Sequence, residues 1–190
     1  MGCGTIFKLT RDGGDNWTLT NLHYFGDGKR GASPNGNLIF DSIGNLYGTA
    51  QYGGVGVCQD GYQGCGAVFE LIPSADGKWT YKILHEFEND GKDGFFPNGA
   101  LVLDKAGNLY GSTPYGGSGQ NCAPNGCGTV FELTPGADGK WTERIVHVFR
   151  NDGDGFVPFA GLTADRAGNL YGTTTSGGAQ GGGTIFEITP

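Results

Sequence analysis

The sequence predicts an all-β fold in which one unit of four antiparallel strands is repeated along the chain. The segment Asn-Leu-Tyr-Gly occurs three times, beginning at Asn45, Asn108 and Asn169. Tryptophan and histidine recur at one constant interval, at Trp17, Trp79 and Trp141 and at His23, His85 and His147. No segment places apolar residues at helical spacing over three turns. A repeat of this length is typical of one supersecondary unit whose neighbours bury each other's apolar faces.

One complete copy runs from Asn98 to Phe149 and contains alternating apolar and polar residues between breaks rich in Gly, Asp and Asn. This pattern predicts strands joined by tight turns. The predicted strands of this copy are Ala100–Asp104, Asn108–Thr113, Thr129–Thr134 and Trp141–Phe149. A long loop separates the second strand from the third, and short turns follow the first and third strands. Four consecutive antiparallel strands describe a propeller blade.

We therefore predict a single repeat domain, with units of approximately 1–34, 35–97, 98–158 and 159–190, the first and last being partial. The chain begins with the third and fourth strands of a blade and ends with the first three. We expect closure either by terminal strands that share a blade or by dimerisation, because both remove exposed sheet edges. A β-trefoil, which also has three four-stranded repeats, is the alternative.

The composition excludes some partners. The net charge is −7 and no basic patch is present, so nucleic acid and anionic membrane are not expected as partners. No apolar run is long enough to span a bilayer. A predicted strand follows Met1 almost at once, so we expect no signal peptide in this chain and interpret it as a mature piece or a section of a longer array.

Cysteines occur at equivalent places in two loops. Cys58 and Cys65 bracket one loop, and Cys122 and Cys127 bracket the matching loop of the next copy. This arrangement predicts two local disulfides in an oxidising compartment. A zinc site built from both pairs is the alternative, although the spacings are loose for zinc. Cys3 is outside these two predicted pairs. We expect it either to remain a thiol or to form a disulfide between chains.

The C-terminal segment resembles a known family. Gly-Asn-Leu-Tyr-Gly-Thr-Thr, then Gly-Gly, then Gly-Gly-Gly-Thr-Ile-Phe-Glu-Ile-Thr-Pro, within Gly168–Pro190, is similar to the GloVer tandem repeat of long extracellular bacterial proteins, which often carry a C-terminal anchor (the choice-of-anchor type). The resemblance covers nearly the whole chain. It implies secretion and a propeller-like β fold, and it brings no catalytic motif with it. This sequence is shorter than those members, and we expect no anchor segment in it.

The loops after the second and fourth strands are long, and in an up-and-down meander they share one face. Function concentrates on long loops held by a rigid scaffold. Aromatic rings beside amides suit sugar rings. The candidate ligand-binding residues are Tyr52, Tyr115, Phe95, Phe96, Phe156 and Asn98. The alternative interpretation is that these aromatics fill gaps between blades and that the asparagines form turns.

Two acidic loops indicate a second kind of site. Asn89–Gly94 and Asn151–Gly155 resemble fragments of calcium loops, because closely spaced carboxylates beside glycine suit a hard cation. The candidate calcium ligands are Asp90, Asp93, Asp152 and Asp154. Asx turns are the alternative, and no other cofactor is predicted. The three histidines recur in every copy, so we interpret them as part of the hydrogen bonding of each blade rather than as metal ligands.

The function predicted first is a secreted module that binds a polysaccharide or oligosaccharide on the long-loop face. The alternative is a glycoside hydrolase or polysaccharide lyase, which would use acids that break the repeat. Candidate catalytic acids are Asp60, Glu88 and Asp154, with Asp93 also counted among the non-repeated acids of this face. No nucleophile elbow, zinc-protease motif or phosphate loop is present. A structural scaffold, closed as a homodimer, is a third reading.

Overall fold

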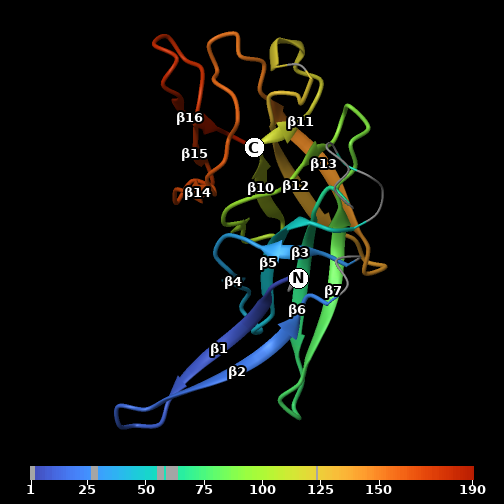
Figure 1. Cartoon of the computed structure of the whole chain (residues 1–190), viewed down its shortest axis with the longest axis vertical. Coiled ribbons are helices and arrows are strands. Elements are labelled where there is room, and N and C mark those ends of the chain that lie inside the picture. The colour runs from blue at the N-terminus through green and yellow to red at the C-terminus, as the bar shows by residue number, and fades with distance from the viewer. Residues whose placement is uncertain (1–2, 27–29, 55–57, 59–63, 123) are drawn as a thin grey trace.

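The computed structural model describes the chain apart from residues 1–2, 27–29, 55–57, 59–63 and 123. The all-β prediction is confirmed, since the described residues form antiparallel sheets and one 3-10 turn, η2 (Gln120–Cys122). The main sheets follow one another from blue β1 and β2 at the bottom of Figure 1 to red β14, β15 and β16 at the top. No helix in this described part is long and apolar enough to cross a bilayer.

Two repeats form complete four-stranded meanders in which consecutive strands pair antiparallel. The first of these contains β4 (Ile39–Phe40), β5 (Leu46–Tyr52), β6 (Ala67–Pro73) and β7 (Trp79–Glu86). The next contains β9 (Val102–Leu103), β10 (Leu109–Thr113), β12 (Thr129–Pro135) and β13 (Trp141–Val148). Each repeat thus builds its own sheet, in the strand order expected of a blade rather than of the trefoil alternative.

The ends of the chain form partial sheets. The N-terminal one pairs β1 (Thr5–Arg11) with β2 (Trp17–Tyr24), which correspond to the third and fourth strands of a complete repeat. The C-terminal one contains β14 (Thr163–Ala164), β15 (Leu170–Thr174) and β16 (Thr184–Ile188), which correspond to the first three. Among the described residues these are two separate sheets, so terminal strands do not share a blade within one chain.

The long loops do share one face, because they pair with each other. The connection after β7 contains β8 (Gly94–Phe95), which pairs with β11 (Tyr115–Gly116) in the loop after β10. In the preceding repeat, β3 (Ala32–Pro34) pairs in the same way with the end of β5. We call the surface formed by the loops after the second and fourth strands the long-loop face.

A hydrogen-bond network ties the first three strands of a repeat together, and its tyrosine–glutamate contact is buried in the two complete repeats and exposed in the C-terminal one. The carboxylate of Asp104 accepts hydrogen bonds from the backbone N–H of Ala106 and Asn108, both at 2.8 Å, and from the Asn108 side chain at 2.9 Å. The hydroxyl of Tyr110 donates to Glu132 Oε1 at 2.8 Å and lies 3.4 Å from Asp104 Oδ2. The same contacts recur in the other copies, at Asp41, Asn45, Tyr47 and Glu70 and at Asp165, Asn169, Tyr171 and Glu187. The repeated aspartates and third-strand glutamates thus have a structural role.

Each Asn-Leu-Tyr-Gly segment ends in glycine because the ring of a third-strand phenylalanine occupies the space that a side chain would need. A Cβ at Gly111 would lie 2.4 Å from Phe131 Cζ and 2.8 Å from Leu101 Cδ2. The same clash, with Phe69 and with Phe186, would arise at Gly48 and Gly172. A side chain here would therefore push the ring of the third strand out of the core.

One edge-to-face phenylalanine pair joins each sheet to the next. Phe87, just after β7, packs on Phe131 of the next sheet, with ring centroids 5.1 Å apart and planes at 66°. The equivalent pairs are Phe25 with Phe69, at 5.7 Å, and Phe149 with Phe186, at 5.1 Å. We call each of these contacts a joint. Edge-to-face rings are a favourable arrangement that also buries a large apolar area.

We predict that Phe131→Ala lowers the free energy of unfolding by about 3–5 kcal/mol, because it leaves a large cavity at a joint. Phe131 is fully buried, whereas its repeat equivalent Phe7 is 52% exposed. Phe7→Ala is therefore the matched control, with an expected loss below about 1 kcal/mol. Urea denaturation followed by tryptophan fluorescence measures both. Equal losses would contradict the assignment of the joint as the core of the molecule.

Candidate functional site

Covalent bonds hold the long-loop face. The two predicted disulfides are confirmed, between Cys58 and Cys65 and between Cys122 and Cys127. The zinc alternative, which used both cysteine pairs, is therefore wrong. The thiol of Cys3 lies 3.6 Å from the carbonyl oxygen of Gly26.

The backbone of this face is also constrained. Ser33, Phe96 and Val157 occupy equivalent places in the connections between repeats, and all have positive φ, near 53–59°. Their N–H groups donate to the carbonyl oxygens of Cys3, Cys65 and Cys127 at 2.7–2.9 Å. A left-handed conformation is unusual for a β-branched residue such as valine, so these hydrogen bonds stabilise a strained connection.

The predicted aromatic residues lie mostly beneath this surface. Phe95 and Phe96 are buried, 1% and 8% exposed, in the core shared by the second and third repeats. Tyr52 and Tyr115 are half-buried, and each rests on one of these rings: Tyr52 on Phe96 and Tyr115 on Phe95. The phenylalanines thus support the tyrosines from below. Phe156 is half-buried in the next connection.

The predicted amide and acids fall in different environments. Asn98 is buried, and its Nδ2 has no hydrogen-bond partner among the described residues. Asp90 Oδ1 accepts hydrogen bonds from the N–H groups of Lys92 and Asp93, at 2.8 and 2.9 Å, which is an Asx turn. Asp152 is exposed. Asp60 lies outside the described residues. Calcium binding by the acidic loops stays a prediction.

The structure places a pocket beside each repeated histidine, at the long-loop end of the fourth strand. The pocket at His23 has a volume of about 460 Å³, that at His85 about 520 Å³ and that at His147 about 450 Å³. Each histidine ring meets, edge to face, the phenylalanine two residues further on, with centroids 4.6–4.8 Å apart. We call these the histidine pockets.

Two histidine pockets contain a matching histidine–carboxylate pair. His85 Nε2 lies 3.3 Å from Asp93 Oδ2, and His147 Nε2 lies 3.1 Å from Asp154 Oδ2. Asp93 and Asp154 are therefore repeat equivalents, and the expectation that they are non-repeated acids was wrong. In the first copy, Arg30 precedes the equivalent glycine in place of the acid. In these two copies the histidine takes part in the hydrogen bonding of its own repeat, whereas His23 has ring contacts with Phe25 and Tyr81 instead.

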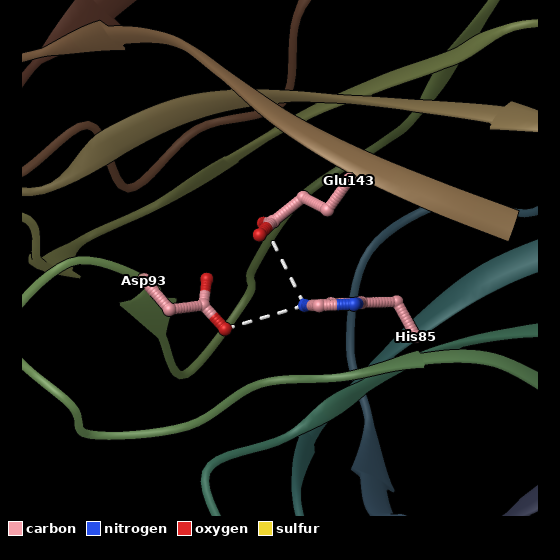
Figure 2. Close-up of side chains that lie close together, drawn as sticks. All are labelled: His85, Asp93 and Glu143. Carbon is pink, nitrogen blue, oxygen red and sulfur yellow. Dashed lines mark hydrogen bonds and ion pairs between the residues drawn. The ribbon is translucent and has the colours of Figure 1, made fainter.

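The next sheet supplies the opposite wall of the histidine pockets at His23 and His85. The ring of Tyr81 stacks on His23, with centroids 4.1 Å apart and planes at 5°. At the next joint, the equivalent strand position is Glu143, whose Oε1 lies 3.6 Å from His85 Nε2. Figure 2 shows Asp93 and Glu143 reaching the same ring nitrogen of His85 from different sides. Glu143 was missed by the sequence analysis, although it is the acid that breaks the repeat where Leu19 and Tyr81 stand in the other copies.

The pocket at His85 also has distinctive electrostatics. Burial raises the pKa of Glu143 to about 8; the charge of His85 opposes this and the charge of Asp93 adds to it. Burial lowers the pKa of His85, but the carboxylates of Asp93 and Glu143 outweigh it, so that the pKa is raised overall. The pKa of His23 is lowered instead, because burial and the charge of Arg30 both disfavour the protonated ring.

Glu88 lies in the same pocket as His85 but does not touch its ring. Its backbone N–H donates to Asp93 Oδ2 at 3.0 Å, which helps to orient that carboxylate. Its own side chain is exposed and lines the pocket together with Glu86, Asp90 and Lys92. The structure thus brings Glu88 and Asp93 together and places Asp154 in the next pocket.

A cavity of about 650 Å³ opens on the opposite face, between the short turns that precede β10 and β15. Its acids include Asp104 and Asp165, which already accept hydrogen bonds from turn amides and asparagine side chains. It therefore offers fewer unsatisfied polar groups than the pocket at His85.

We predict that, with a chelator present, the free energy of unfolding falls as pH rises from about 5 to about 8. The raised pKa values of Glu143 and His85 mean that the folded state holds protons that the unfolded state has released in this range. Urea denaturation at several pH values measures the slope. Glu143→Gln should remove most of it, and Glu86→Gln, in the same pocket, should keep it. An unchanged slope in Glu143→Gln would contradict the assignment.

Comparison with family models identifies the family of this chain. A search of curated proteins gives no match. The Gloeobacter/Verrucomicrobia repeat matches residues 1–190, which is the whole chain. With its repeated all-β sheets and equivalent loops, the chain belongs to the Gloeobacter/Verrucomicrobia repeat family.

Proposed function

We propose that this chain is a secreted repeat module that binds an extracellular glycan along its long-loop face, with one shallow site in each histidine pocket. The observation that carries this proposal is the recurrence of the pocket. Three pockets of about 450–520 Å³ lie in equivalent positions, each beside the histidine of a fourth strand. This size is within the range of small-ligand sites, and equivalent sites in a row suit a polymer of repeating sugars.

The pocket at His23 has the chemistry that best suits a sugar ring. Tyr24 is 63% exposed and lines this pocket together with Phe25 and Tyr81, so an aromatic ring is available to the C–H face of a pyranose. Arg30 lines the same pocket and offers donors for hydroxyl groups. The hydroxyl of Tyr81 donates to the carbonyl oxygen of Arg30 at 2.6 Å, which connects the two sides of the site.

The other two histidine pockets are more polar. The pocket at His85 offers the acceptors Glu86, Glu88 and Asp90 and the donor Lys92. The pocket at His147 is lined by Arg150, Asp152 and Asp154. Mixed donors and acceptors of this kind suit sugar hydroxyls. Tyr52 and Tyr115, supported by buried phenylalanines, extend the proposed surface.

Secretion and ring closure belong to the same proposal. Two disulfides are compatible with an extracellular protein. The sheets would stand as propeller blades around a shared axis, closed by a second copy of the chain. Apolar residues exposed on the terminal sheets, such as Leu9 at 50% and Ile185 at 84%, support this arrangement. Light scattering coupled to size-exclusion chromatography tests it, and a monomer would contradict it.

The second candidate function is a glycan-cleaving enzyme, favoured by the raised pKa of Glu143 beside Asp93. A protonated acid next to another carboxylate is the pairing that glycoside hydrolysis requires. However, this acid pair occurs at one joint among the described residues, whereas pockets recur beside all three histidines. The repetition therefore supports binding better than cleavage.

We predict that Tyr24→Ala weakens glycan binding about tenfold or less, as expected for one stacking ring. A glycan array identifies the ligand, and calorimetry with that ligand measures the affinity. Trp17→Ala is the matched control, because Trp17 is an exposed aromatic at the opposite end of the same strand, β2. It should leave the affinity unchanged. Tyr52→Ala and Tyr115→Ala test the wider face and should each weaken binding.

The outcomes separate the candidate functions. Unchanged affinity in Tyr24→Ala, Tyr52→Ala and Tyr115→Ala would refute the proposed face. Release of reducing sugar from pooled polysaccharides would favour the enzyme, with Glu143→Gln abolishing it. Absence of both binding and release would favour the structural scaffold.

A further inference from the structure

We propose that His85, Asp93 and Glu143 bind one divalent transition-metal ion, of the zinc class, across the joint between the second and third repeats. The three ligands come from β7, from the loop that follows it and from β13 of the next sheet (Figure 2). The ion would link two sheets across the joint formed by Phe87 and Phe131. This inference goes beyond glycan binding and does not depend on it.

The distances between the ligand atoms suit a small ion. His85 Nε2 lies 3.3 Å from Asp93 Oδ2 and 3.6 Å from Glu143 Oε1, and all three ligand atoms lie within 4.8 Å of one another. Zinc binds imidazole nitrogen and carboxylate oxygen at about 2.0–2.2 Å, so tetrahedral ligands are about 3.3 Å apart. Two of the three separations are already close to that value, and small rotations of the carboxylates would complete the site.

The donor set indicates the class of ion. One imidazole and two carboxylates form a nitrogen and oxygen set with three protein ligands, which zinc and its neighbours accept with water in the fourth position. Calcium prefers six to eight oxygen ligands, which this cluster does not provide. The pocket of about 520 Å³ beside the ligands leaves room for that water or for an oxygen of a bound molecule.

A separate observation points to a missing partner. Glu143 Oε1 is buried and has no hydrogen-bond donor among the described residues, although it faces His85. The side chains of His85, Asp93 and Glu143 are 20%, 11% and 16% exposed, so water has limited access to them. A buried acceptor without a donor destabilises the folded state, and a bound cation would remove this penalty.

The ligands are held in position before any ion binds. Asp93 Oδ1 accepts the N–H of Gly94 at 2.6 Å, and Oδ2 accepts the N–H of Glu88 at 3.0 Å. The ring of His85 packs edge to face on Phe87, with centroids 4.6 Å apart. Contacts of this kind fix ligand orientation in metal sites and reduce the conformational entropy lost on binding.

The other histidine pockets serve as internal comparisons. His147 and Asp154 repeat the first two ligands, but the metal-ligand cluster found among the described residues is confined to His85, Asp93 and Glu143. At His23, Tyr81 occupies the place of Glu143 and Arg30 that of Asp93. The proposed site therefore belongs to one joint, because two acids coincide there.

The test uses the whole chain, treated with a chelator and then titrated with Zn²⁺ by calorimetry. We expect one ion per chain, and a melting temperature that rises with Zn²⁺ concentration because the ion binds the folded state. Glu143→Gln and Asp93→Asn should each weaken binding at least tenfold. The matched control Asp154→Asn, in the equivalent pair, should bind as the wild type does, and Cys3→Ser excludes binding by the thiol.

The proposal is overturned if the wild type shows no saturable binding of Zn²⁺, or if Glu143→Gln binds with wild-type affinity. Circular dichroism confirms that each variant is folded. As a measurement that needs no variant, Co²⁺ added to the wild type should give the visible absorption of a four-coordinate ion, and a purely octahedral spectrum would overturn the proposal. Because this readout requires no sugar, its failure would leave the glycan proposal to its own test.

Discussion

The edge-to-face phenylalanine pair at each joint is the contact on which the rest of this structure depends. It sets how closely one sheet approaches the next, and it requires that the strand beneath carry no side chain where the ring passes. The glycine that ends all three Asn-Leu-Tyr-Gly segments meets that requirement. A side chain at this glycine would clash with the ring and with a leucine. A substitution of the glycine would therefore disrupt the joint.

The joint also explains where chemistry can vary. Once two sheets are held at this distance, the third residue of each fourth strand lies opposite the histidine of the preceding repeat. That position is Tyr81 at one joint and Glu143 at the next, and the environment of the histidine changes from an aromatic stack to a buried carboxylate cluster. A rigid repeat with one variable wall can therefore offer related pockets with different chemistry, without altering the core that supports them.

The same residue types have opposite roles at the two ends of the sheets. At the short-turn end, Asp104, Asn108, Tyr110 and Glu132 form a closed network in which turn amides and a buried hydroxyl supply the donors. At the long-loop end, Glu143 Oε1 is buried without a donor among the described residues. A satisfied network stabilises the fold, whereas an unsatisfied acceptor marks a place where a ligand can bind. Acid content alone cannot distinguish these cases, since both ends are rich in carboxylates.

The sequence by itself determined the all-β class, the order of the strands, the turn positions and both disulfides, because these depend on alternation, turn residues and contacts within one repeat. It could not decide that Phe95 and Phe96 lie in the core, nor that Glu143 meets His85 while Asp93 and Asp154 are equivalent. Those facts depend on the packing of one repeat against the next. Contacts between repeats depend on the distance between sheets, and this distance is set by the side-chain volumes at the joint. The residue pattern of a single repeat does not specify that distance, so only the tertiary structure shows these contacts.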